Sequence, residues 1–126
     1  MSLRTPLAQV RGLGSAKQGA HHWWMQRITA VMLIPLFIWF VGTTVTLVTG
    51  NYAEAVNLIR DPFAAAALLM LIIVVFYHAA LGLQVVIEDY ISAEGRQIGT
   101  IVVMRFVMSL LAAISIVAAL KVAIGG

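Results

Sequence analysis

The run FAAAALLMLIIVVFYHAALGLQVVI occupies residues 63–87 and contains no Lys, Arg, Asp or Glu. About 20 mainly apolar residues are enough to cross a hydrocarbon core of roughly 30 Å. Lipid offers no hydrogen bonds to the backbone, so a single spanning segment has to pair its own N–H and C=O groups as a helix. The run therefore predicts a transmembrane helix.

Two further runs, at residues 28–49 and 98–124, meet the same length requirement. The 126-residue chain is 62% hydrophobic and 10% charged, against about 25% charged in an ordinary soluble domain. A soluble domain this small could not bury so much apolar surface. We expect an all-α membrane protein with three transmembrane helices, forming one domain over residues 1–126 with an N-terminal segment at 1–27.

Turn-forming residues separate the three runs. Residues 50–51, Gly-Asn, end the first run, and residues 94–95, Glu-Gly, mark a turn before the third. Asp61 is placed to cap the second helix, with Pro62 at the first helical position. Pro35 lies inside the first run and predicts a kink, because its ring removes a backbone donor.

The basic residues are distributed unequally between the two sides of the membrane. Six lie on one side (Arg4, Arg11, Lys17, Arg27, Arg96 and Arg105), and two lie on the other (Arg60 and Lys121). Lys and Arg near helix ends favour the inner side. We therefore expect the N-terminus inside and the C-terminus outside.

Composition also excludes several functions. The net charge of +3 comes from eight scattered basic residues and five acidic ones, so no cluster predicts nucleic-acid binding. The chain has no cysteine, which excludes thiolate-bound iron–sulfur clusters and covalently attached c-type haem. No nucleophile–base arrangement is present, and we expect no catalytic residue in this chain alone.

His78 is the one ionisable side chain that the pattern places deep within a span, about 16 Å from the inner helix end. An intramembrane ionisable residue is a functional-site hypothesis by default. Ligation of a metal and a hydrogen bond to a neighbouring helix are equally good interpretations. Gly82 lies about 40° from His78 around the helix. It either clears space for a flat macrocycle or allows close helix packing.

Three residues at the inner membrane level are further candidates. Asp89 and Tyr90 could hydrogen-bond a quinone and relay protons. Alternatively, they form a solvated helix end with an aromatic belt residue. Arg27 could pair with a carboxylate such as a haem propionate, or serve as an ordinary snorkelling anchor.

Taken together, these positions resemble the hydrophobic membrane anchor subunit of succinate dehydrogenase, respiratory complex II. The histidine is followed by glycine four residues later and by Asp-Tyr at 89–90, and residues 26–30, QRITA, resemble the start of the family's first helix. The opening, from Arg4 through the segment RGLGSAK at 11–17 to His22-Trp23-Trp24, is similar to the form found in bacteria related to mitochondria.

The resemblance implies a role for each candidate. His78 would be one axial ligand of a haem b shared with a partner anchor chain of the cytochrome b type, and Arg27 would face a propionate. Tyr90 would donate a hydrogen bond to ubiquinone, with Asp89 beside it. Flavoprotein and iron–sulfur subunits would complete the complex, and a bacterial inner membrane is favoured over a mitochondrial one.

Three other functions remain open. An anchor of a quinol:fumarate reductase would run the same chemistry in reverse. A purely structural, cofactor-free subunit would tolerate substitution of His78, Asp89 and Tyr90. A small transporter is a weaker candidate, because it would need more polar residues within the spans.

Overall fold

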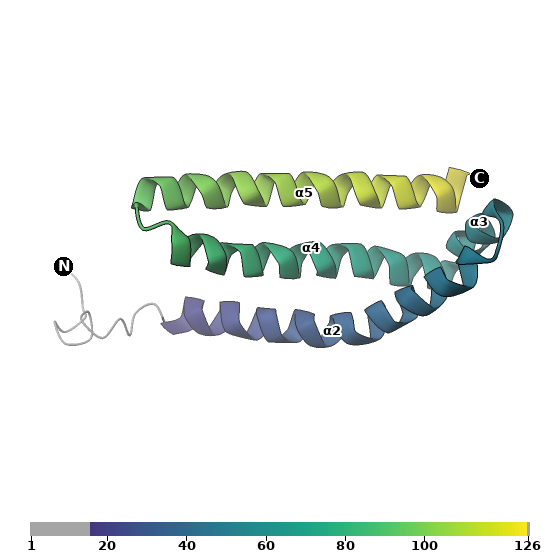
Figure 1. Ribbon diagram of the computed structural model, residues 1–126, viewed down its shortest axis with the longest axis horizontal. Helices are drawn as coiled ribbons and strands as arrows, with labels where there is room; N and C mark the ends of the chain where they lie inside the picture. The colour runs from purple at the N-terminus through teal and green to yellow at the C-terminus, as the bar shows by residue number, and fades with distance from the viewer. Residues whose placement is uncertain (1–15, 126) are drawn as a thin grey trace.

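The computed structural model describes the backbone of residues 16–125 and the side chains of residues 19–125. Four helices follow one another along the chain (Figure 1): α2 at Ala16–Val48, α3 at Tyr52–Arg60, α4 at Pro62–Tyr90 and α5 at Glu94–Gly125. Three of them, at Gly19–Val48, Pro62–Tyr90 and Glu94–Gly125, are long and apolar enough to cross a membrane. The expected all-α architecture with three transmembrane helices is confirmed.

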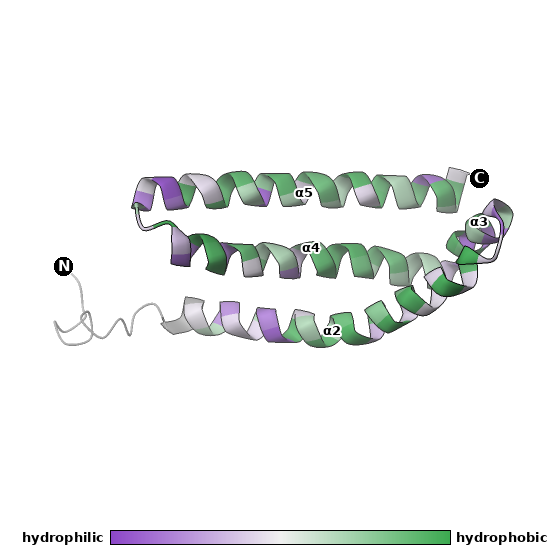
Figure 2. Ribbon diagram, in the orientation of Figure 1, coloured by the Kyte–Doolittle hydropathy of each residue, from purple (hydrophilic) through white to green (hydrophobic). Residues whose placement is uncertain are grey.

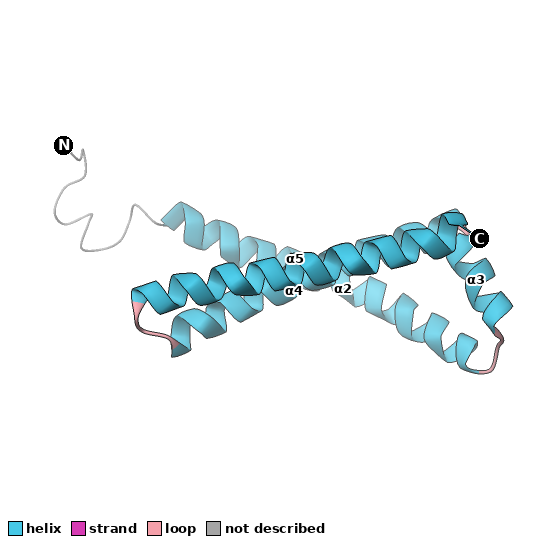
Figure 3. Ribbon diagram, turned by 90° about the horizontal axis from the view of Figure 1, so that it is seen from above, coloured by secondary structure: helices cyan, strands magenta, loops and turns pink. Residues whose placement is uncertain are grey.

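α4 lies in the middle and runs antiparallel to both α2 and α5 (Figure 1). α4 packs against α2 on one side and α5 on the other, and α2 crosses the α4–α5 pair when viewed from above (Figure 3). The start of α2 and the α4–α5 connection lie at one end, whereas α3 and the end of α5 lie at the other (Figure 1). The two ends of the described chain are therefore at opposite membrane faces.

The helices bury little of their apolar surface against one another. The core is a cluster of Leu33 from α2 with Leu71 and Val74 from α4. Apolar residues make up most of all three long helices (Figure 2), and large apolar side chains such as Ile38 and Phe106 are 69% and 68% exposed. Lipid or partner helices must cover this surface, because proteins in water rarely expose a continuous apolar patch of this size.

The structure confirms the predicted cap of α4, and it shows that the predicted starts of α2 and α5 and the predicted turn before α5 were wrong. The Asp61 side chain accepts a hydrogen bond from Ala64 N at 3.0 Å, with Pro62 in the first turn, as expected. α2 begins at residue 16 instead of 28 and α5 at 94 instead of 98, because a helix can continue beyond the hydrocarbon core into the polar interface. The turn expected at 94–95 lies at residues 91–93 instead.

Helix α3 was not expected, because residues 50–62 were interpreted as a short connection. Its N-terminus carries a capping box: Asn51 accepts from Glu54 N at 3.0 Å, and the Glu54 carboxylate accepts from Asn51 N at 3.3 Å. An Asn followed three residues later by Glu is a helix-start signal that can be recognised in the sequence.

α2 contains Pro35 and bends along its length in Figure 1, in agreement with the expected kink. The side chains of Arg4, Arg11 and Lys17, and residues 11–15 of the opening motif, lie outside what the structure describes.

Candidate functional site

His78 and Thr29 join α4 to α2 in the middle of the bundle. The His78 Nδ1 atom lies 2.8 Å from Thr29 Oγ1. Thr29 is 4% exposed and is the one buried polar residue among those that the structure describes. His78 itself is half-buried. It lies twelve residues, roughly 18 Å, before the end of α4, close to the middle of a helix of this length.

The bonds of Thr29 favour one tautomer of the His78 ring. The Thr29 hydroxyl donates within α2, to Met25 O at 2.7 Å or Gln26 O at 3.1 Å. A carbonyl oxygen can only accept, so the 2.7 Å contact with Met25 O uses the single proton of the hydroxyl. With that proton on Met25 O, Thr29 Oγ1 accepts from the Nδ1–H tautomer of His78. In the neutral ring this leaves Nε2 with its lone pair, which is the form of imidazole that binds a metal.

Gly82 lies where α4 packs against α2. A Cβ atom at Gly82 would lie 3.6 Å from Gln26 Nε2, so the side chain of Gln26 covers this position. This is an ordinary contact distance to the end of a flexible side chain, so both interpretations of Gly82 stay open. Two buried polar atoms on this face of α2, His22 Nε2 and Gln26 Oε1, have no hydrogen-bond partner among the described residues.

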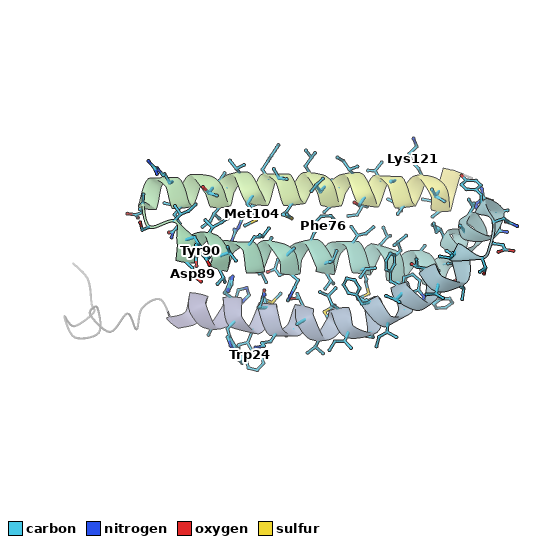
Figure 4. All side chains as sticks on the ribbon, viewed as in Figure 1. Trp24, Phe76, Asp89, Tyr90, Met104 and Lys121 are labelled. Atoms are coloured by element: carbon cyan, nitrogen blue, oxygen red, sulfur yellow. The ribbon has the colours of Figure 1, made fainter. Side chains whose placement is uncertain are left out.

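Asp89 and Tyr90 lie together at the end of α4, beside the start of α5 (Figure 4). Both are exposed, and Tyr90 retains 85% of its accessible surface. Tyr90 lines an open cavity of about 660 Å³ with Ser92, Arg96 and Thr100. The sequence did not identify these three polar residues as part of a site, because only the folded α4–α5 turn brings them to Tyr90.

Arg27 is not brought to His78 within this chain. It lies two residues before Thr29, about 200° around α2, and so projects from the side of α2 turned away from α4. Its guanidinium carbon lies 5.1 Å from the centroid of the Trp23 ring. Trp23 in turn makes an edge-to-face contact with Trp24, with ring centroids 5.1 Å apart. This cluster places a cation and two indoles at one end of α2.

Arg105 is a second ionisable side chain within a helix long and apolar enough to span the membrane. α5 begins earlier than expected, so Arg105 lies eleven residues, about 16 Å, from its start. Arg105 Nη2 donates to Gln84 Oε1 at 2.5 Å, and Gln84 Nε2 donates to Glu88 Oε1 at 3.0 Å. The signal available in the sequence was a pair of polar residues, Gln84 and Arg105, within otherwise apolar runs.

The described residues hold no group of three or more His, Cys, Asp or Glu side chains that could bind a metal ion by themselves. His78 is thus a single donor, and a metal there needs a ligand from elsewhere. The sequence also matches a protein family described as the succinate dehydrogenase/fumarate reductase transmembrane subunit, over residues 1–114. The chain belongs to this family.

Individual relatives in this family are named as succinate dehydrogenase hydrophobic membrane anchor subunits. The chain is 38% identical to that of Rickettsia bellii over 72% of its own length and 73% of the relative's. It is 36% identical to that of Rickettsia conorii over 71% of each chain. The Paracoccus denitrificans subunit is 28% identical over 86% of this chain and 84% of its own.

The bacterial relatives and the three apolar helices identify this family member as a multi-pass protein of a bacterial inner membrane. No solved structure matches the chain.

Proposed function

We propose that this chain is the membrane anchor of a succinate:ubiquinone oxidoreductase, contributing one axial ligand of haem b and part of the ubiquinone site. The proposal draws on the family and on the relatives' names. The bond between Thr29 and His78 is the hydrogen bond to a neighbouring helix that the sequence left open, and it is compatible with haem ligation because it leaves the other ring nitrogen of His78 free. The chain has no cysteine to bind an iron–sulfur cluster. It therefore needs an iron–sulfur subunit and a flavoprotein subunit to supply electrons from succinate.

The donor set around His78 fits a haem shared between two chains. A ligating histidine usually donates its other ring N–H to a nearby oxygen, which fixes the ring and raises its basicity. Thr29 Oγ1 is such an oxygen, at 2.8 Å from Nδ1. We assign the second axial histidine to a partner anchor subunit of the cytochrome b type. When bound, the haem supplies a reversible one-electron centre in the apolar interior.

Tyr90 and Asp89 are proposed as the part of the ubiquinone site that this chain contributes. The phenol donates a hydrogen bond to a quinone carbonyl, and the carboxylate beside it exchanges protons with water. Both side chains are exposed at the end of α4, and the cavity next to Tyr90 has polar and apolar walls. Reduction of a quinone consumes two protons, which a site at the membrane surface takes directly from the aqueous phase.

We place this end of the bundle on the inner side of the membrane. The described side chains of Arg27, Arg96 and Arg105 belong to that half of the bundle, whereas Arg60 and Lys121 belong to the other half. The positive-inside rule then orients the helices with the α4–α5 connection inside. We also retain Arg27 as the partner of a haem propionate, reached along the inner end of α2.

The first test of the proposal is isolation of the complex through a tag on this chain, with flavin and haem measured together. The anchor function predicts co-isolation of flavin, and the haem assignment predicts one haem b per flavin. Flavin without haem would remove the ligand role of His78 but keep the anchor. Absence of both would favour the structural, cofactor-free alternative.

Tyr90→Phe tests the quinone assignment. The variant keeps the ring and removes the hydroxyl, so we expect succinate–quinone activity to fall about tenfold or more, as for a lost catalytic hydrogen bond. Succinate oxidation by an artificial dye should stay unchanged, because the dye accepts electrons upstream. Full quinone reductase activity in the variant would contradict the site.

A fumarate reductase anchor is the second candidate, since the family description covers both enzymes. The direction of turnover depends on the potentials of all the redox centres in the complex. The names of the relatives favour succinate oxidation. Comparing succinate–quinone and quinol–fumarate rates of the isolated complex separates the two.

A further inference from the structure

The groove between α4 and α5 holds a polar chain that neither the haem nor the quinone assignment uses. Arg105 donates to Gln84 at 2.5 Å, and Gln84 donates to Glu88 at 3.0 Å. Gln84 and Arg105 also line a cavity of about 370 Å³. The remaining wall is mainly apolar and includes Ile73, Phe76, Tyr77, Ala80, Met108 and Ala112. The apolar slot therefore ends at the Arg105 guanidinium, and the Glu88 carboxylate lies further toward the C-terminal end of α4.

The depth of these groups matches the boundary between acyl chains and headgroups. The 29 residues of α4 span about 43 Å, so a core of roughly 30 Å leaves about 6–7 Å projecting at each end. Gln84 lies six residues, about 9 Å, from Tyr90 and therefore about 2–3 Å inside the boundary. Glu88 is one turn further out, about 6 Å, and lies in the headgroup layer.

We propose that this groove binds a zwitterionic aminophospholipid of the phosphatidylethanolamine type. The phosphate pairs with Arg105, the ammonium pairs with Glu88, and an acyl chain occupies the apolar slot beside Phe76. From the membrane interior outward, the apolar slot, Arg105 and Glu88 follow one another in the same order as the acyl chain, the phosphate and the ammonium of the lipid. The proposal goes beyond the anchor function and depends on neither haem nor quinone.

The charges of the groove favour a zwitterion over other ligands. A guanidinium at membrane depth needs an anion or a polar partner, and Gln84 engages one of the five N–H donors that an Arg carries. A net anionic headgroup would satisfy Arg105 but would lie against the Glu88 carboxylate. A primary ammonium donates hydrogen bonds to that carboxylate, whereas the quaternary ammonium of phosphatidylcholine has no N–H to donate.

The test uses the intact complex isolated in mild detergent, with bound lipid measured by native mass spectrometry. We compare the wild type with Arg105→Gln, Glu88→Gln and Lys121→Gln. The last is the matched control, because Lys121 projects from the far end of α5 away from α4 (Figure 4). Thermal shifts on adding phosphatidylethanolamine, phosphatidylcholine, phosphatidylglycerol or inorganic phosphate form a second readout.

We expect Arg105→Gln to lower phosphatidylethanolamine retention about tenfold, the scale of one lost charge-assisted contact. Glu88→Gln should keep phospholipid but lose the preference for phosphatidylethanolamine over phosphatidylcholine, and Lys121→Gln should match the wild type. If Arg105→Gln prevents assembly, Arg105→Lys keeps the charge and should retain the lipid.

Equal lipid retention by wild type and Arg105→Gln would overturn the site. A preference for phosphatidylethanolamine that survives Glu88→Gln would overturn the ammonium assignment. Stabilisation by phosphatidylglycerol equal to that by phosphatidylethanolamine would make the site one for anionic lipid and overturn the zwitterion. Stabilisation by inorganic phosphate alone would identify an ion site and overturn the lipid proposal.

Discussion

Thr29→Val is the substitution that most specifically perturbs the proposed haem ligand without touching it. Valine has nearly the shape of threonine, so the buried position between α2 and α4 stays filled. The change removes the oxygen that accepts the 2.8 Å bond from His78 Nδ1–H. An imidazole without this partner can turn or move its proton to Nε2, the nitrogen assigned to the iron.

The expected effect follows from the cost of that unsatisfied donor. A buried N–H left without a partner costs about 1–3 kcal/mol, and loss of an outer-shell partner lowers metal affinity about 10–100-fold. We therefore expect haem affinity in Thr29→Val to fall by one to two orders of magnitude. Titration of haem into the haem-depleted complex, followed by its absorbance, measures the affinity directly.

Two companion variants separate the hydrogen bond from packing. Thr29→Ser keeps the hydroxyl and should retain most of the affinity. Thr44→Val removes a hydroxyl that is exposed and bonded only within its own helix, to Phe40 O at 2.8 Å, and should leave haem binding unchanged. Wild-type affinity in Thr29→Val would refute the reasoning that Thr29 orients His78.

Substitutions at three further positions probe other parts of the bundle. Gly82→Ala should be tolerated, because the added Cβ lies at ordinary contact distance, 3.6 Å, from Gln26 Nε2. Gly82→Leu should force α2 from α4 and lower thermal stability by about 1–3 kcal/mol; equal melting of the two variants would argue against the contact. Asp61→Ala should lower stability by about 1 kcal/mol through the lost cap on Ala64 N, and unchanged melting would show that the cap is dispensable. Arg27→Gln should lower haem retention, with Arg27→Lys intermediate because lysine lacks the bidentate fork; full retention in Arg27→Gln would leave Arg27 as an interfacial anchor.

The transmembrane helices were predictable because every backbone N–H and C=O group of a span in lipid has to be hydrogen-bonded within the protein. The run at 63–87 has to be helical whatever it packs against, and Asp61-Pro62 defines its start through local chemistry alone. The helix ends that face water are harder to predict, because water can hydrogen-bond their backbone groups. The interfacial residues before Ile28 can be helical or extended, so the beginning of α2 was placed twelve residues too late.

The site was predictable to the extent that a residue is unusual in its own segment. His78 is conspicuous among apolar neighbours, and Asp89-Tyr90 follows it along one helix. Thr29 is not conspicuous, because threonine is common in apolar helices and its importance comes from its position opposite His78. The link from Arg105 to Gln84 likewise depends on how α5 lies along α4, which neither segment encodes by itself.

The ligand role of His78 is tested most directly by a reduced-minus-oxidised visible spectrum of the isolated complex carrying His78→Ala, beside the wild type. The wild type should show the bands of a b-type haem with two histidine ligands. The variant should retain flavin and this chain while the haem bands disappear or shift to those of a ligand-deficient haem. Unchanged haem bands at full occupancy in His78→Ala would contradict the account.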